Sequence, residues 1–149
     1  MELLQKALQR YPSEFHAYCL MLNHIHLILG TIHHTPTDLI HYLHSVYARY
    51  FNQGDNYVGH LFQGRFFSKQ IHNHKQLLDT SAYIHLNPEK SNYTNLPEDY
   101  LWSSYGAFLT ASKSTIIHTG KILSLLGDYP HLKYQLFVET RRKINEWNI

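Results

Sequence analysis

The sequence predicts one domain of the α+β class. Two neighbouring segments, 15–21 and 24–30, have the residue pattern of strands, and only a two-residue connection separates them. In most of the remaining chain the apolar residues recur at helical spacing. The length of 149 residues suits a single domain. We expect this domain to span residues 1–149, with 110–149 forming a helical C-terminal extension.

The composition excludes several classes of protein. The chain is 44% hydrophobic and 16% charged, which argues against intrinsic disorder. It carries charge from Glu2 onward, and no apolar run is long enough for a signal peptide or a membrane span. Cys19 is the single cysteine, so a disulfide framework or a zinc finger is excluded and a cytoplasmic location is expected. The net charge of +2 is only weak support for nucleic-acid binding, for which local stripes of Lys and Arg matter more.

The first helices are predicted on either side of the two strands. Residues 2–10 carry leucines at helical spacing. Thr35, Pro36 and Asp38 are typical of a helix start. Gly54 should end this second helix. Its apolar stripe is expected at Leu39, Leu43, Val46 and Tyr50.

The strand at 24–30 alternates, and this alternation places two histidines together. Even-numbered residues face one side of the sheet and odd-numbered residues face the other. His24 and His26 therefore share a face, about 7 Å apart along the strand. We expect the opposite face to be core. The residues on that opposite face are Ile25, Leu27 and Leu29.

Further elements are predicted in the second half of the chain. A short strand at 66–71 is followed by a helix at 74–87, which Pro88 should end. Residues 97–105 form a turn leading into a helix, and 131–147 form a helical tail. The basic run of this tail, 141–143, is either a solvated helix end or a contact with DNA. The apolar stripe of the helix at 74–87 comprises Leu77, Leu78, Ser81 and Ile84.

Tyr83 and Asn87 form a second pattern with chemical meaning. They lie four residues apart, so they share one face of the predicted helix, away from its core stripe. A tyrosine hydroxyl is a nucleophile, and an amide oxygen is a hard metal ligand. Two imidazoles and one amide oxygen would leave positions for water and a phosphate, which suits Mg²⁺ or Mn²⁺ better than structural zinc. Two histidines at this spacing on a strand, taken alone, are more often polar surface residues than metal ligands.

Four ordered motifs give the chain a family resemblance. They are Met21-Leu-Asn-His-Ile-His-Leu27, Gly59-His-Leu-Phe-Gln-Gly-Arg-Phe66, Tyr83-Ile-His-Leu-Asn-Pro88 and Pro97-Glu-Asp-Tyr-Leu-Trp-Ser-Ser-Tyr105. In order and spacing they resemble the single-tyrosine transposases of the IS200/IS605 type, whose signature is His-hydrophobe-His. The closest similarity is to the branch associated with repetitive extragenic palindromes. The resemblance covers roughly residues 15–109.

The resemblance implies a fold, a site and a reaction. The fold is a ferredoxin-like antiparallel sheet with helices packed on one face. The signature falls on His24 and His26 as metal ligands, the catalytic tyrosine on Tyr83 and the third metal ligand on Asn87. The implied reaction is metal-dependent cleavage and rejoining of single-stranded DNA or a DNA hairpin through a 5′-phosphotyrosine intermediate. A tyrosine hydroxyl has a pKa of about 10 and is a poor nucleophile at neutral pH, so the reaction needs the assistance of the metal.

The resemblance also places the loop 59–66 near DNA. Arg65 could hold a phosphate with a bidentate fork, as arginine often does. The alternative for this loop is a structural turn with Phe62 in the core. The candidate DNA-binding residues are His60, Gln63 and Arg65 of the loop, together with Arg49 and Lys69.

Three conspicuous side chains are expected to be structural. His85 lies two residues after Tyr83, so it faces a different direction and is expected to support the fold rather than to bind metal. Trp102 and Tyr105 are expected to pack inside the protein rather than to stack on bases.

The chain departs from the family at its start. Members usually begin with an additional strand and a longer helix before the segment that starts here at Phe15. We therefore expect the sheet to lack its usual N-terminal strand. An open sheet edge of that kind favours pairing with a second copy in a homodimer. The alternatives to an active enzyme are a catalytically inactive remnant that binds DNA hairpins and a small metal-binding protein unrelated to DNA.

Overall fold

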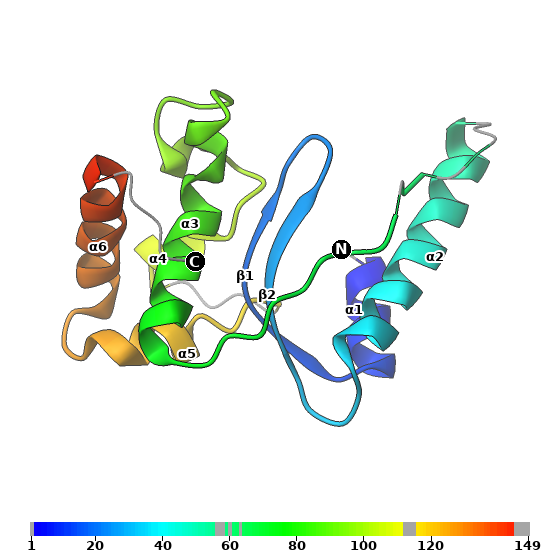
Figure 1. The fold of residues 1–149 in the computed structure, drawn as a ribbon, viewed down its shortest axis with the longest axis horizontal. Coiled ribbons are helices and arrows are strands. Elements are labelled where there is room, and N and C mark those ends of the chain that lie inside the picture. The colour runs from blue at the N-terminus through cyan, green and yellow to red at the C-terminus, as the bar shows by residue number, and fades with distance from the viewer. Residues whose placement is uncertain (1, 56–58, 60, 63, 112–115, 145–149) are drawn as a thin grey trace. The chain divides into compact units, whose positions relative to one another are not determined.

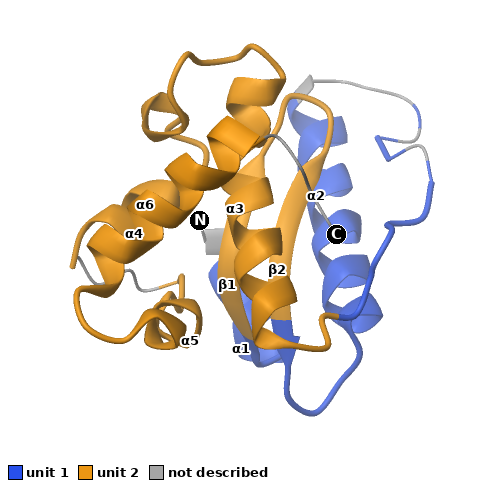
Figure 2. Cartoon of the chain, turned by 60° about the vertical axis from the view of Figure 1, so that its left-hand side comes forward, with its two compact units in different colours: residues 1–13, 30–70 blue, residues 14–29, 71–149 orange. Residues whose placement is uncertain are grey.

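The computed structural model describes residues 2–55, 59, 61–62, 64–111 and 116–144. These residues form helices and a two-stranded antiparallel sheet (Figure 1), which confirms the prediction of an α+β fold. The chain divides into two compact units (Figure 2). Unit 1 comprises residues 1–13 and 30–70, and unit 2 comprises residues 14–29 and 71–149. The described helices include none that is long and apolar enough to cross a membrane.

Unit 1 is built from two helices, α1 (Glu2–Arg10) and α2 (Pro36–Asp55). The start of α2 is closed as its sequence predicts, because the backbone nitrogen and the hydroxyl of Thr35 both donate to the Asp38 carboxylate. The two helices pack together and bury Ala7 and Leu39. The expected apolar stripe does not continue to Tyr50, which is largely exposed. With its nine residues, α1 spans about 14 Å and can cover only part of the twenty-residue α2.

The strand predicted at 66–71 does not form. Residues 66–70 have no regular structure, and the side chain of Phe67 is almost fully exposed. A strand needs a partner for its backbone hydrogen bonds, and in the described part of the chain β1 and β2 pair only with each other and through isolated bridges.

The sheet consists of β1 (Ser13–Leu20) and β2 (Ile25–Thr31), within one or two residues of the predicted strands. The expectation that the face with Ile25 is core is wrong. Ile25 is 58% exposed, whereas Ile28, on the histidine face, is only 4% exposed. The reason is that Ile28 joins the hydrophobic core built from β1 and the helices of unit 2. The histidine face is therefore covered at Ile28, whereas His24 on the same face is exposed.

Unit 2 is organised around α3 (His74–Lys90). Asn73 caps the start of this helix, because its side chain accepts a hydrogen bond from the nitrogen of Gln76. Its predicted apolar stripe is confirmed by the burial of Leu77, Ser81 and Ile84. The prediction that Pro88 ends this helix is wrong, since the helix continues to Lys90. Pro88 has no backbone N–H, so the helix loses one hydrogen bond there. Because Pro88 lies in the last turn, the hydrogen bonds that close the helix end still form, and the nitrogen of Ser91 donates to the carbonyl of Asn87.

The remaining elements of unit 2 are short, apart from the last. The longest, α6 (Pro130–Ile144), matches the predicted tail up to residue 144, and residues 145–147 of that prediction lie outside the described residues. Tyr134 and Val138 of α6 are buried against Tyr105 and Phe108 in the core. The other elements are η1 (Pro97–Asp99), α4 (Tyr105–Leu109), α5 (Gly120–Leu123) and η2 (Ser124–Leu126).

Candidate active site

The two histidines of the predicted signature meet at the end of the β-hairpin. A tight turn brings them there, because the nitrogen of Met21 donates to the carbonyl of His24. The Nε2 atoms of His24 and His26 are 3.0 Å apart. His24 Nδ1 lies 2.7 Å from the side-chain oxygen of Asn23, so Nδ1 is assigned the proton. This tautomer leaves a lone pair on Nε2 of His24, directed at His26.

Tyr83 lies directly beside this pair. Its ring meets the ring of His26 edge to face, with the centroids 5.8 Å apart. The histidine comes from β2 and the tyrosine from α3, so the fold brings together the two patterns that the sequence shows separately. Tyr83 is half-buried at the margin of the hydrophobic core.

Asn87 follows one turn later on the same helix. Its amide nitrogen donates to the backbone carbonyl of Tyr83 over 3.0 Å. The amide oxygen is therefore the atom left to act as an acceptor or a ligand. The side chain is buried, which differs from the expectation that this face of the helix points away from the core side. The difference arises because this face is turned toward His26 and the sheet rather than toward solvent.

Lys90 is a site residue that the sequence reasoning missed. Its ammonium lies 5.2 Å from the centroid of the Tyr83 ring, and partial burial lowers its pKa. Residues 83, 87 and 90 share one face of a continuous helix, so the i, i+4, i+7 spacing was the available signal. The predicted helix ends before Pro88 and so does not include Lys90, which is why this spacing is missing from the prediction.

The electrostatics of the site favour a neutral imidazole at His26. Partial burial, together with the neighbouring His24, lowers the pKa of His26. A neutral ring offers a lone pair to a cation, whereas a protonated ring repels one. No group of three or more His, Cys, Asp or Glu suited to a metal occurs among the residues that the structure describes. Any metal here would rely on the two imidazoles, an amide oxygen and groups from outside the protein.

His85, next to this face, is structural, as the sequence led us to expect. It is fully buried, and both ring nitrogens are used: Nδ1 lies 2.8 Å from the Tyr134 hydroxyl, and Nε2 lies 2.8 Å from the Ser104 hydroxyl. Burial lowers the pKa of His85 to about 3. The ring is therefore neutral across the physiological range.

The candidate DNA-binding residues and the four residues of the candidate active site do not belong to the same unit. Arg49, Arg65 and Lys69 are exposed and belong to unit 1, whereas His24, His26, Tyr83 and Asn87 all belong to unit 2. His60 and Gln63 lie outside the described residues. Phe62 stacks on the ring of His44, with the centroids 3.8 Å apart, and is half-buried.

The basic run of α6 is held by acidic residues of α3. Arg141 pairs with the buried Asp79, and Arg142 contacts both carboxylate oxygens of Glu89, at 2.7 and 2.8 Å. Two of its three cations therefore join helices, which neither sequence interpretation anticipated; Lys143 remains exposed.

The two aromatic residues of the last motif have opposite positions. Tyr105 is buried, as expected, but Trp102 is 66% exposed, so the expectation that it packs inside is wrong. The segment lies along the edge of β1, where the carbonyl of Trp102 accepts from the nitrogen of Leu20 and Ser103 forms a bridge with Cys19. Side chains alternate along such a segment, and here the inward position falls on Ser103.

Comparison with known proteins identifies the family. The family model described as "Transposase IS200 like" matches residues 1–87, a segment that contains His24, His26, Tyr83 and Asn87. No curated protein and no solved structure matches the chain. Because the matched segment is more than half of the 149 residues, the chain belongs to the family of IS200-like transposases.

Proposed function

We propose that the protein cleaves and rejoins single-stranded DNA, with Tyr83 as the nucleophile. The observation that carries the proposal is the contact of Tyr83 with His26, whose Nε2 lies 3.0 Å from that of His24. The family is one of transposases, whose reaction cleaves and rejoins DNA, and the matched segment contains all four residues of the proposed site.

The donor set fits a divalent cation with octahedral coordination. Two nitrogens, each about 2.1 Å from one ion and at right angles, lie about 3.0 Å apart. This spacing agrees with the 3.0 Å between the histidine Nε2 atoms. The amide oxygen of Asn87 would be the third ligand. Imidazole and oxygen donors with open positions suit Mg²⁺ or Mn²⁺. When bound, such an ion would act as a Lewis acid on a phosphate oxygen.

Tyr83 would carry out the covalent step. Its hydroxyl oxygen would attack phosphorus in line with the 3′ oxygen and lose its proton to water. The bond between phosphorus and the 3′ oxygen would break, and that oxygen would take up a proton as a free 3′ hydroxyl. The 5′ phosphate would remain on Tyr83 as a phosphodiester. Attack by another 3′ hydroxyl would reverse these steps and rejoin the strand without an external source of energy.

Lys90 would supply positive charge beside this step. Its ammonium lies 5.2 Å from the Tyr83 ring. A cation beside the ring would stabilise the additional negative charge that the phosphate develops during attack. Asn87 would hold the backbone of Tyr83 through its amide nitrogen while its oxygen faces the cation.

The four sequence motifs support two finer proposals. Their order resembles the branch associated with repetitive extragenic palindromes, so we expect a DNA hairpin with a single-stranded flank as the substrate. The two-stranded sheet has an edge on β2, which favours a homodimer formed through that edge.

The test is formation of a covalent adduct with such a hairpin in the presence of Mg²⁺ or Mn²⁺. The wild type should give a species that migrates more slowly in a denaturing gel, and Tyr83→Phe should give none while it still binds DNA. Tyr129→Phe is the matched control, since Tyr129 is an exposed tyrosine away from the helix that carries Tyr83. Removal of metal with EDTA should abolish the adduct.

The remaining outcomes separate the alternatives. Hairpin binding by the wild type without any adduct, with either metal, would identify a catalytically inactive DNA-binding remnant. An adduct that persists in Tyr83→Phe would place the nucleophile elsewhere. An adduct that survives EDTA would contradict the metal site.

A further inference from the structure

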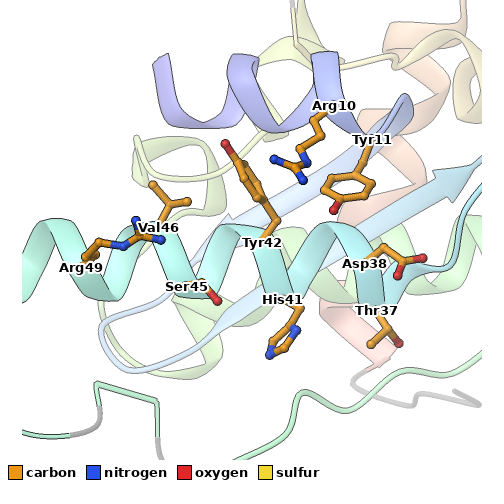
Figure 3. Close-up of a pocket in the computed structure, with 9 residues that line it drawn as sticks. All are labelled: Arg10, Tyr11, Thr37, Asp38, His41, Tyr42, Ser45, Val46 and Arg49. Carbon is orange, nitrogen blue, oxygen red and sulfur yellow. The ribbon is translucent and has the colours of Figure 1, made fainter.

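A cavity of about 360 Å³ lies in unit 1, between the end of α1 and one side of α2. Figure 3 shows its lining: the guanidinium of Arg10 lies beside the rings of Tyr11 and Tyr42, while His41 and Ser45 project from the other side of the α2 ribbon. All the lining residues belong to unit 1. The cavity is therefore built from residues other than those of the candidate active site.

One row of α2 in this cavity consists of polar side chains that donate hydrogen bonds. Its members are spaced by four residues, so they follow one side of the helix, with neighbours about 6 Å apart along the axis. From its first to its last member the row extends about 18 Å. Hydroxyl and guanidinium groups are common contacts of phosphate in nucleic-acid complexes. The row comprises Thr37, His41, Ser45 and Arg49.

Arg10 lines the cavity from α1 and is held in place by aromatic rings. Its guanidinium carbon lies 5.7 Å from the centroid of Tyr11 and 5.3 Å from that of Tyr42. The two rings also contact each other edge to face at 5.8 Å. Stacking uses the faces of a guanidinium and leaves its in-plane donors available for a phosphate. The ordering has a second benefit, because less side-chain entropy is lost on binding.

The cavity carries excess positive charge. In the described part of the chain neither Arg10 nor Arg49 forms an ion pair. The cavity contains one carboxylate, that of Asp38, and Thr35 holds its Oδ2 at the start of α2 through the backbone nitrogen and the hydroxyl. These hydrogen bonds also lower the pKa of Asp38. The two guanidinium groups thus outnumber the carboxylate and have donors to spare.

We propose that this cavity binds the sugar-phosphate backbone of a DNA strand, as a contact additional to the active site. A ligand with a single phosphate would fill one end of a row about 18 Å long, whereas a strand presents a series of phosphates along it. The proposal rests on the proposed function, since the strand held here would be part of the DNA that Tyr83 cleaves. It adds Arg10, with Thr37, His41 and Ser45, to the candidate contact Arg49.

The test compares the double variant Arg10→Gln/Arg49→Gln with the wild type in binding a fluorescent DNA hairpin that carries a single-stranded flank. Affinity is measured by anisotropy between about 50 and about 200 mM salt. Loss of two charged contacts should weaken binding at least about tenfold. It should also reduce the slope of log K against log salt by about 1.4 to 1.8, the contribution of two phosphates. The matched control is Lys121→Gln/Lys133→Gln, which removes the same charge from exposed residues of unit 2.

The outcomes separate this proposal from the proposed function. Adduct formation by the wild type reports on the active site, whereas the binding comparison of the double variant with the lysine control reports on the cavity, whose lining residues all lie in unit 1. A binding loss equal to that of the lysine control would overturn the proposal, whatever the result of the adduct assay. An unchanged salt slope would overturn it too. Separate probes of single strand and of blunt duplex, equal in length, show which part of the hairpin the cavity holds, and a loss on either supports the proposal. Melting temperatures establish that the variants are folded.

Discussion

Protonation of His85 should make this protein sensitive to mild acid. The ring is fully buried and touches only neutral groups: the hydroxyls of Tyr134 and Ser104 at its nitrogens, and the rings of Tyr105 and Phe108 at its faces. Tyr134 donates onward to Ser81, so it accepts the Nδ1 proton of the histidine. Among the residues that the structure describes, no carboxylate stabilises an imidazolium there, and burial is the cause of the lowered pKa.

The magnitude follows from the two pKa values. The pKa of His85 falls from 6.5 to about 3 on folding, so the unfolded chain binds one more proton between those values. The contribution to stability is fully present above pH 6.5 and is lost as the pH falls toward 3, at about 1.4 kcal/mol per pH unit. Between pH 7 and pH 5 the loss from this one residue is about 2 kcal/mol.

Urea unfolding at a series of pH values measures this loss. His16, His26 and His44 also have lowered pKa values, so the test is the difference between the wild type and His85→Gln, which keeps those three. The variant should be less stable at pH 7, because a shorter amide leaves hydroxyl groups unpaired, but it should lose about 2 kcal/mol less between pH 7 and pH 5. Parallel curves of stability against pH for the two proteins would refute the reasoning.

Three further outcomes are expected. Thr35→Ala should destabilise the protein by about 1 kcal/mol in thermal or urea unfolding, since it removes the hydroxyl that pairs with Asp38 at the start of α2. Burial raises the pKa of the Cys19 thiol to about 11, so a disulfide reagent should modify it only in denaturant; rapid reaction of the native protein would show that β1 opens locally. Arg142→Ala should cost about 1 kcal/mol, and a double-mutant cycle with Glu89→Ala assigns that cost to their contact between α6 and α3.

The sequence predicted the elements well where local signals agree. The start of α2 carries a capping pair, and α3 carries an apolar stripe, and both helices form where expected. The strand expected at residues 66–71 depended on composition alone. A strand is not determined by its own residues, because its hydrogen bonds need a partner segment, and the described chain provides none there.

The burial of the sheet could not be predicted from alternation. A period of two separates the faces of β2 but does not say which face is covered. The prediction places the core on the face without histidines. Ile28 on the histidine face is instead buried, because the core of unit 2 covers it. Trp102 shows the same limit, since its size suggested packing and its position on the sheet edge exposes it.

The sequence predicts the candidate site as two separate pairs of residues, but it does not predict that the two pairs lie close together. Spacing placed His24 with His26, and Tyr83 with Asn87, whereas their proximity depended on the family resemblance until the structure showed the contact of Tyr83 with His26. Lys90 shows how one wrong boundary hides a residue. Once the helix is known to pass Pro88, the position of Lys90 on the face of Tyr83 follows from its period.

The contacts on the opposite side of α3 explain why a segment outside the family match bears on the site. Residues 83 and 85 lie about 200° apart around the helix, so fixing His85 also fixes the direction in which Tyr83 points. The partner of His85 Nε2 is Ser104, whose hydroxyl also accepts from the nitrogen of Tyr18 on β1. The strand paired with β1 carries His26.

Hydrogen bonds therefore connect the helix that carries Tyr83 to the strand that carries His26. The other partner of His85, Tyr134, comes from α6, as do Arg141 and Arg142, which pair with Asp79 and Glu89 at two further turns of α3. Three points of attachment along α3 prevent both rotation and sliding, whereas a single point would prevent neither. The matched residues 1–87 contain all four candidate site residues, but α6, at 130–144, holds in register the helix that carries Tyr83 and Asn87.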